Sequence, residues 1–217
     1  MRLYRFWPIF PALLALVSLA CQISSIFETP SSADVLFQDD FSDPSSGWLQ
    51  GEDDIGTAEY FNGGFRIYVT SDHAAKLSIL RLQPFTDVRL EVEATKVAGP
   101  DDNDFGLVCR YLDEDNFYFL EISSDGYYGI GKYKNDELIL MSATQMQSSE
   151  AIVQGAAKNS LRADCIGNSL SLYVNGVKLA EVSDSEFGAG NVGLIAGTFE
   201  TPGVDIFFDN FTIFMPK

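Results

Sequence analysis

Short runs of β-branched and aromatic residues, separated by Gly, Asn, Asp and Ser, follow one another from residue 35 onward. Runs in which hydrophobic and polar positions alternate are typical of half-buried strands, and no segment has the 3.6-residue period of an amphipathic helix. The pattern predicts about fourteen strands. They are expected at 35–41, 57–61, 65–70, 76–82, 88–96, 105–112, 117–123, 127–133, 137–141, 160–166, 169–174, 177–182, 192–196 and 204–214.

The turns between these runs favour antiparallel pairing. Asn62-Gly63-Gly64, Asp125-Gly126 and Asn175-Gly176 are sequences that form tight hairpin turns. Segment 142–158 lacks periodicity and is expected to be a long loop or an irregular crossover. The chain is therefore predicted to be all-β, a two-sheet antiparallel β-sandwich of the jelly-roll type.

The first 21 residues have the features of an export signal. Arg2 and Arg5 precede an uncharged apolar run, which ends in Ser18, Leu19, Ala20 and Cys21. The apolar run is shorter than the roughly 20 residues of a membrane span, which favours cleavage over retention. Residues 22–34 are polar and Ser-rich and are expected to be a flexible tether, so the folded domain is predicted to be 35–217.

Ala20-Cys21 resembles the lipobox of bacterial lipoproteins, in which the Cys is lipidated and becomes the new N-terminus. This resemblance implies lipidation of Cys21, a membrane anchor, and a place at the cell surface or in the periplasm. The sequence departs from the family pattern, because Ser18 stands where the family usually has Leu. Ser18 and Ala20 would also suit ordinary secretory cleavage, which is the alternative.

The chain has three cysteines. If Cys21 carries lipid, Cys109 and Cys165 remain as an even pair in an oxidising compartment, which suits a disulfide between neighbouring strands. The alternative is two small buried apolar side chains. The sequence contains no CxxC motif and its single histidine is His73, so no transition-metal site is expected.

Three segments near the C-terminus carry a family resemblance. They are DNFYFLEISSDGYYGIGKY, LRADCIGNSLSLYVNGVKLAEV and VGLIAGTFETPGVDIFFDNFTI, and VLFQDDFSDPSSGW at the start of the domain extends the match over 35–215. They resemble strands of the concanavalin A-like lectin and glucanase superfamily, in particular laminin-G-like domains and 3-keto-disaccharide hydrolase-like domains. The resemblance implies the sandwich fold but not one chemistry, since this fold carries lectins, hydrolases and adhesion modules.

The charge of the chain excludes one class of partner. Lys and Arg number 14 against 31 Asp and Glu, a net charge of -17. Such a surface repels phosphate backbones and no segment supplies a basic stripe, so no nucleic acid is expected as a partner. With 46% hydrophobic and 13% aromatic residues, the chain has enough apolar surface to fold.

An enzyme of this superfamily would need paired carboxylates on one strand. Glu91 and Glu93 in LEVEATK alternate as the retaining glucanases require, but the third acidic position is missing. The simpler interpretation is that Glu91 and Glu93 form the solvated face of a strand whose core face is Leu90, Val92 and Ala94. No catalytic residue is therefore assigned.

Acidic loops raise the question of calcium. Sandwiches of this superfamily often hold structural Ca²⁺ where the first and last strands meet, and the resemblance would place such a site at Asp39 and Asp209. The alternative is that these are ordinary loop and edge carboxylates in a very acidic protein. No motif requires a cofactor.

The strands at 105–112, 117–123 and 127–133 are separated by turns of a few residues and should form a three-stranded meander. Both faces of the second and third strands are rich in aromatic residues, which suits sugars because their C–H surfaces pack on aromatic rings. The expected ligand contacts are Arg110, Glu121, Tyr127, Lys132 and Tyr133. Arg110 and Glu121 are expected to pair, although the alternation does not place Lys132 and Tyr133 on one face.

These features predict an exported, lipid-anchored carbohydrate-binding or adhesion module without catalysis, whose partner is a glycan or cell-surface polysaccharide. One alternative is a glycosidase-like enzyme related to the 3-keto-disaccharide hydrolases. Another is a structural or protein-interaction domain.

Overall fold

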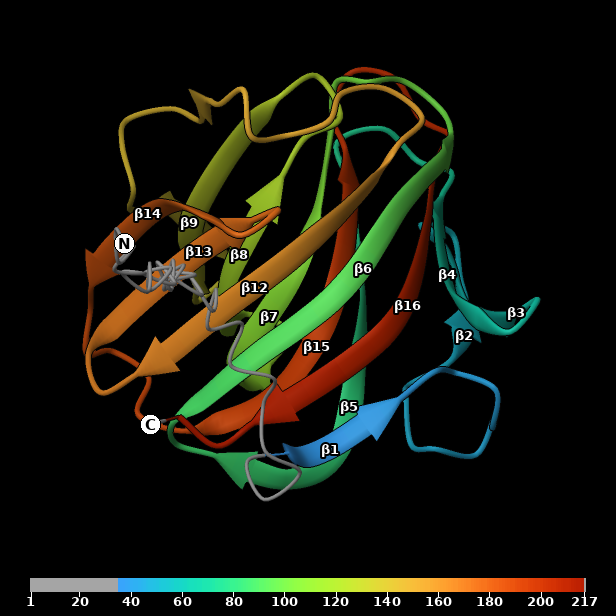
Figure 1. Ribbon diagram of the computed structural model, residues 1–217. Coiled ribbons are helices and arrows are strands. Elements are labelled where there is room, and N and C mark those ends of the chain that lie inside the picture. Colours follow the sequence, from blue (N-terminus) through green and yellow to red (C-terminus); the bar gives the residue numbers. More distant parts are fainter. Residues whose placement is uncertain (1–34, 217) are drawn as a thin grey trace, which may run out of the picture.

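A computed structural model describes residues 35–216. Within this range the chain forms sixteen strands and no helix, arranged as two antiparallel sheets. The predicted all-β sandwich of the jelly-roll type is confirmed (Figure 1). No helix of the described range is long and apolar enough to cross a membrane. The proposed export signal and tether lie outside the described residues.

The larger sheet has nine strands. Its order is β14 (Val177–Ser183), β13 (Ser169–Val174), β12 (Lys158–Ile166), β6 (Val88–Ala98), β16 (Val204–Phe214), β4 (Gly64–Val69), β3 (Gly56–Phe61) and β2 (Gly51–Glu52), with β1 (Val35–Asp39) paired to β16. The first and last strands of the domain therefore lie side by side.

The smaller sheet has seven strands. Its order is β10 (Glu137–Leu140), β9 (Tyr127–Lys134), β8 (Asn116–Ile122), β7 (Asn103–Asp113), β15 (Gly190–Thr198) and β5 (Ala75–Phe85), with β11 (Gln147–Ser148) paired to β9. The adjacent strands β7, β8 and β9 are the predicted meander. The two-residue strands β2 and β11 were not expected, because pairs this short carry no alternation pattern.

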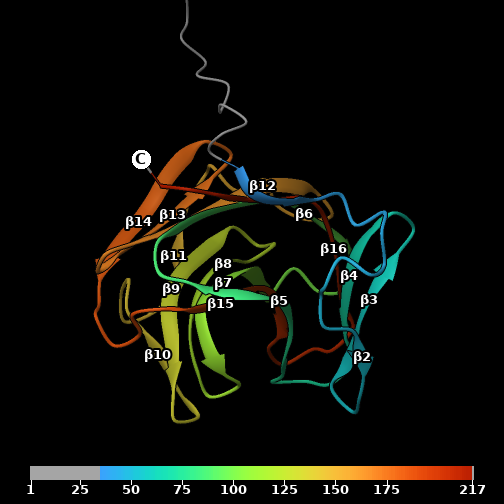
Figure 2. The same cartoon turned by 90° about the horizontal axis from the view of Figure 1, so that it is seen from below.

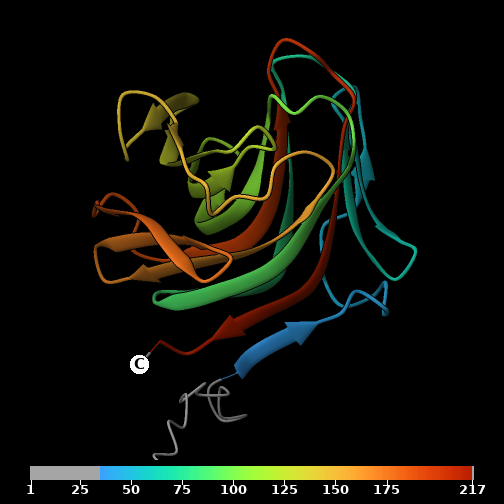
Figure 3. The ribbon, with the colours of Figure 1, turned by 45° about the horizontal axis from the view of Figure 1, so that its top comes forward.

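The main core lies between the inner faces of the two sheets, which form separate curved layers (Figure 3). Leu90, Val92 and Ala94 of β6 are buried there, as their alternation with Glu91 and Glu93 predicted. Because successive side chains of a strand point to opposite faces, each sheet contributes every second residue to this core.

A disulfide joins Cys109 of β7 to Cys165 of β12 across this core. The expectation of a bridge between neighbouring strands is wrong in one respect, since β7 belongs to the smaller sheet and β12 to the larger one. Both cysteines are fully buried. The bond therefore connects the two sheets directly, in addition to their hydrophobic contact.

A second hydrophobic cluster lies on the other face of the smaller sheet. It contains Ile79, Val108, Phe117, Phe119 and Ile195. Seen from below, the smaller sheet lies inside the curve of the larger one, with β10 on one side and β2 and β3 on the other (Figure 2). An apolar sheet face that the second sheet does not cover is where a ligand would find unoccupied contact surface.

Candidate functional site

A groove of about 450 Å³ runs over this outer face of the smaller sheet. Residues 49–55, which include β2, form one side of the groove. The β7–β8 and β9–β10 turns close one of its ends. The floor is formed by side chains of β5, β8 and β9. Segments that are distant in sequence therefore meet along one hollow, which is the usual form of a binding site.

Three aromatic rings line the groove. The ring of Phe117 stacks on that of Tyr133 at a centroid distance of 5.0 Å, and Tyr111 lies 5.8 Å from Phe117 on the other side. Burial, with a contribution from the charge of Glu121, raises the pKa of Tyr133 to about 12. The three rings form a row of π-faces, held in place by packing on one another.

Charged groups surround the aromatic row. Asp53, Glu114, Asp115 and Asp136 line the groove together with one cation, Lys76. The Lys76 Nζ atom lies 2.5 Å from an Asp53 oxygen. The groove as a whole therefore carries a negative charge, and its single ammonium group is already paired.

Two further carboxylates, Asp104 of β7 and Glu121 of β8, belong to the same sheet face. Glu121 follows Phe117 and Phe119 by alternation and is only 6% exposed. Asp104 keeps part of its surface exposed, but its Oδ1 atom is enclosed and has no hydrogen-bond partner in the described structure.

The environment of both carboxyls disfavours their charged form. Burial raises the pKa of Asp104 to about 7, with a smaller contribution from the charge of Asp102. Burial also raises the pKa of Glu121 well above its ordinary value, and the charge of Asp104 adds to this rise. Carboxyls with perturbed pKa values, gathered on one face, are candidates for a functional site.

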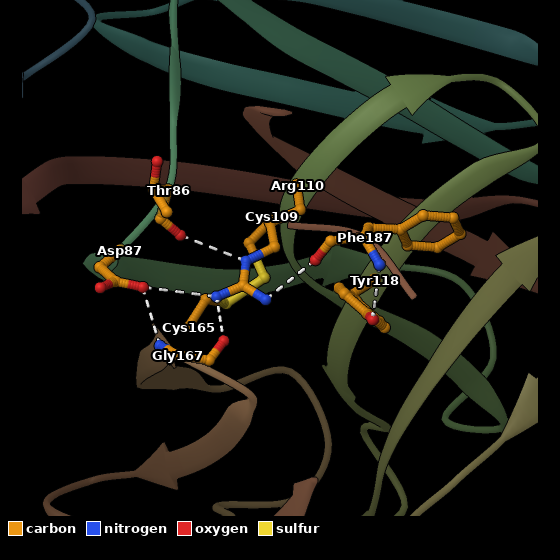
Figure 4. Close-up of a disulfide and its surroundings, with 8 residues drawn as sticks. All are labelled: Thr86, Asp87, Cys109, Arg110, Tyr118, Cys165, Gly167 and Phe187. Carbon is orange, nitrogen blue, oxygen red and sulfur yellow. Dashed lines mark hydrogen bonds and ion pairs between the residues drawn. A yellow bond between two sulfur atoms is a disulfide. The ribbon is translucent and has the colours of Figure 1, made fainter. Parts of the chain in front are cut away.

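The expected pair of Arg110 and Glu121 does not form. Arg110 is 2% exposed, and its guanidinium donates hydrogen bonds to the carbonyl oxygens of Thr86, Gly167 and Phe187 (Figure 4). Asp87 lies 3.5 Å from the same guanidinium. Arg110 therefore ties together three loops at the edge of the sandwich, beside the disulfide, and does not line the groove.

The other predicted contacts divide between the two faces. Lys132 is buried and pairs with Asp184 at 2.6 Å, away from the groove. Tyr133 lines the groove. Tyr127, two positions before Gly129, follows the same alternation as Tyr133 and is exposed at the start of β9. The structure therefore brings Glu121 and Tyr133 to one face and removes Arg110 and Lys132 from it.

The remaining sequence candidates lie elsewhere. Glu91 and Glu93 lie on the outer face of the larger sheet, where Glu93 accepts hydrogen bonds from Asn210 and pairs with Lys158. Both residues point away from the core, as the alternation predicted, but they are half-buried and not fully solvated. His73 is an exposed turn residue whose ring lies 3.6 Å from Glu200.

The proposed calcium ligand Asp39 is already engaged by protein donors. Its carboxylate accepts hydrogen bonds from the Phe41 amide, the Ser46 hydroxyl and the Trp48 indole N–H. Among residues 35–216, no group of three or more His, Cys, Asp and Glu side chains is placed to hold a metal ion. Asp39 therefore fixes the first loop of the domain to its aromatic core, and Asp209 accepts a hydrogen bond from the Asn210 amide.

Several groove residues were not found by sequence reasoning. Tyr111, Phe117 and Lys76 come from three strands that are brought together by the pairing of β5 with β15, of β15 with β7 and of β7 with β8. Asp53 reaches the groove from the loop between β2 and β3 of the larger sheet. The signal that could have placed Phe117 beside Tyr133 is the alternation of β8, which puts Phe117 on the face opposite to Tyr118.

Comparison with solved structures identifies the architecture. The carbohydrate binding module CBM66 from Bacillus subtilis matches with a TM-score of 0.64 and 18% identity, over 78% of this chain and 96% of the module. A Bacillus licheniformis β-glucanase matches with a TM-score of 0.57 and 11% identity, over 86% of this chain and 100% of the enzyme. The chain has the concanavalin A-like jelly-roll fold.

A Bacillus subtilis protein of unknown function with a galectin-like fold is similar to the same extent. It matches this concanavalin A-like chain with a TM-score of 0.60 and 11% identity, over 84% of this chain and 96% of its own. No protein-family model matches the sequence, and no curated protein matches it either. At these identities the likeness establishes the fold alone.

Proposed function

We propose that this chain is an exported carbohydrate-binding module that holds a glycan in the groove on the smaller sheet. The observation that carries the proposal is the aromatic row of Tyr111, Phe117 and Tyr133 along the hollow. Sugar rings present flat C–H surfaces that pack on aromatic faces, and their hydroxyl groups pair with charged side chains such as those of Asp53 and Lys76.

The solved structures that match this fold include proteins that bind or cleave carbohydrates, which supports the proposal. One is a carbohydrate binding module and another is a β-glucanase. Both proteins have the same jelly-roll fold as this chain. In this chain the groove offers a ligand an apolar floor with charged residues along its edges.

A second candidate is a glycosidase-like enzyme, and one observation favours it. Asp104 and Glu121 are neighbouring carboxyls with raised pKa values on the groove face, and glycoside hydrolysis uses two carboxyls of which one must hold a proton. A glycan array followed by product analysis separates the candidates. Capture without release of products supports a binding module, product release supports the enzyme, and no capture at all contradicts both.

Replacing Tyr133 with Ala should weaken glycan binding. Removing one ring from the aromatic row loses buried apolar contact, which corresponds to about a tenfold fall in affinity. Titration calorimetry with the glycan selected on the array measures the effect. Tyr173→Ala is the matched control, because Tyr173 is a half-buried tyrosine on the larger sheet. Equal affinities for the two variants would exclude the groove as the site.

We also propose that lipid on Cys21 anchors the exported protein to the membrane, at the cell surface or in the periplasm. Growth with a fatty-acid analogue should label the full chain, and Cys21→Ala should remove the label, because the thiol is the atom that takes the lipid. Ser25→Ala serves as a control in the same segment and should keep the label. Label that persists in Cys21→Ala, or an unlabelled parent protein, would replace this proposal by plain secretion.

A further inference from the structure

The groove is lined by four acidic side chains and one basic side chain. Glu114, Asp115 and Asp136 line one end, and none of them has an ion-pair partner among the described residues. The one lining cation, Lys76, is engaged by Asp53. A ligand that carried carboxylate or sulfate groups would meet uncompensated negative charge here, so anionic polysaccharides are disfavoured.

Asp104 and Glu121 add an unusual pair of buried carboxyls to this face. The positions directly opposite Glu121 on the neighbouring strands are Gly106 and Gly129, and the position opposite Asp104 on β15 is Gly197. Glycine has no side chain that could donate a hydrogen bond. Neither carboxyl therefore receives a side-chain donor from the strand beside it, and no hydrogen bond to the Glu121 carboxyl occurs within the described residues.

The structure around Asp104 is shaped to hold its carboxyl. A Cβ atom at Gly197 would lie 2.1 Å from the Asp104 Oδ1 atom, so the carboxyl occupies the space that a side chain on β15 would fill. That same Oδ1 atom is enclosed without a partner. Buried polar groups are normally satisfied, so a carboxyl with an unpaired oxygen at this position is a candidate acceptor for hydrogen bonds from a ligand.

An ammonium group on a ligand would supply the hydrogen-bond donors and the positive charge that the Asp104 and Glu121 carboxyls lack. It supplies one positive charge and three N–H donors, and hydrogen bonds from a cation to a carboxylate are stronger than those between neutral groups. A hydroxyl group would donate a single hydrogen bond and leave the charge uncompensated. Two carboxyls alone are few for a protein-made divalent metal site, and residues 35–216 supply no third His, Cys, Asp or Glu side chain to complete one.

The length of the sheet face along β7 suits a glycan of several sugar units better than a single sugar. Strand β7 has eleven residues and spans the face from Asp104 to the turn that carries Glu114 and Asp115. At about 3.4 Å per residue this is roughly 35 Å, with the aromatic row between the two acidic ends. A chain of several sugar units would place amino groups near both ends while its rings pack on the aromatic side chains.

We propose that this face of the smaller sheet selects glycans whose sugars carry free, protonated amino groups, with Glu121 and Asp104, which lie beside the groove, accepting hydrogen bonds from one ammonium group. This inference rests on the proposed carbohydrate-binding function and specifies its ligand class. Asp104 and Glu121 hold the ammonium group, and Tyr133 with Phe117 packs against the sugar rings.

The test compares two oligosaccharides of equal length on the full chain at pH 7. One is a β-1,4-linked glucosamine oligomer, and the other is its fully N-acetylated counterpart, which lacks the positive charge. The parent protein should bind the amino form about tenfold more tightly, as expected for loss of a charge-assisted hydrogen bond. Glu121→Gln keeps the shape of the side chain and should bring the two affinities together.

Glu91→Gln is the matched control and should leave the preference unchanged, because Glu91 lies on the larger sheet. Equal binding of both oligomers by the parent, or a preference that survives in Glu121→Gln, would overturn the inference while leaving carbohydrate binding intact. A lysine oligomer that competes as well as the amino glycan would overturn it too, since charge alone would then explain recognition. Failure of every glycan on the array would instead reject the proposed function itself.

Discussion

Removal of the Cys109–Cys165 disulfide is expected to lower the free energy of unfolding by about 4 kcal/mol, because the bond closes a loop with a sequence separation of 56 residues. The bond limits the conformations of the unfolded chain. It also fixes β7 to β12 and so holds the two sheets together through the core. For a domain of this size the loss corresponds to a fall in melting temperature of about 10 °C.

Urea denaturation of the parent and of the Cys109→Ala/Cys165→Ala double variant measures the difference. Two alanines are used because a single remaining thiol could form intermolecular bonds. A reductant should destabilise the parent and leave the double variant unchanged, which separates the bond from the loss of two sulfur atoms in the core. A difference below about 1 kcal/mol would show that the hydrophobic contact between the sheets is sufficient without the bond.

The fold was predictable because alternation is a local property of the sequence. Leu90, Val92 and Ala94 alternate with Glu91 and Glu93, and this pattern states which face of β6 is buried without reference to any other strand. The β7–β8–β9 meander was predictable for a similar reason, since short turns leave adjacent strands little choice but to pair.

Arg110 shows where this reasoning fails. The residue has φ of 51°, and the pairing of β7 with β8 shifts register between Cys109 and Asp113. A β-bulge adds a residue to one strand and changes the face to which later side chains point. No feature of the sequence predicts this β-bulge. Counting alternate residues along an unbroken strand therefore placed Arg110 beside Glu121.

The groove shows a second limit. Tyr133 and Glu121, both expected as ligand contacts, lie on one face of the smaller sheet, but Asp104, 17 residues before Glu121, was not among the expected contacts. Its role depends on the register of β7 against both β8 and β15. Likewise, both cysteines were expected to pair, yet the partner sheet of each strand follows from the order of strands in space.

Asp104→Asn is expected to stabilise the protein in alkaline solution and to have little effect in acid. The pKa of Asp104 is raised from 3.8 to about 7 because the carboxyl is buried in the folded state. Between pH 4 and pH 7 the folded protein therefore keeps a proton that the unfolded chain has released. Stability is full below the unfolded pKa and is lost as the pH rises through the folded pKa, where the buried group must ionise.

Above pH 7 the cost of this ionisation is about 4 kcal/mol, the free-energy equivalent of a pKa shift from 3.8 to about 7. Asparagine has nearly the same shape and carries no charge, so at pH 8 the variant should exceed the parent by that amount. Near pH 4 the two should unfold at similar urea concentrations. The variant's stability should also depend less steeply on pH between these limits.

Asp54→Asn provides the matched control for this comparison. Asp54 is an exposed aspartate in the loop before β3, and its replacement changes the net charge of -17 by the same one unit. General relief of repulsion in an acidic protein would raise the stability of both variants equally. The difference between them therefore isolates the burial of Asp104. If Asp104→Asn and Asp54→Asn gave the same stability at pH 8, the Asp104 carboxyl would have to be ionised without cost, either by solvent reaching it or by a cation beside it.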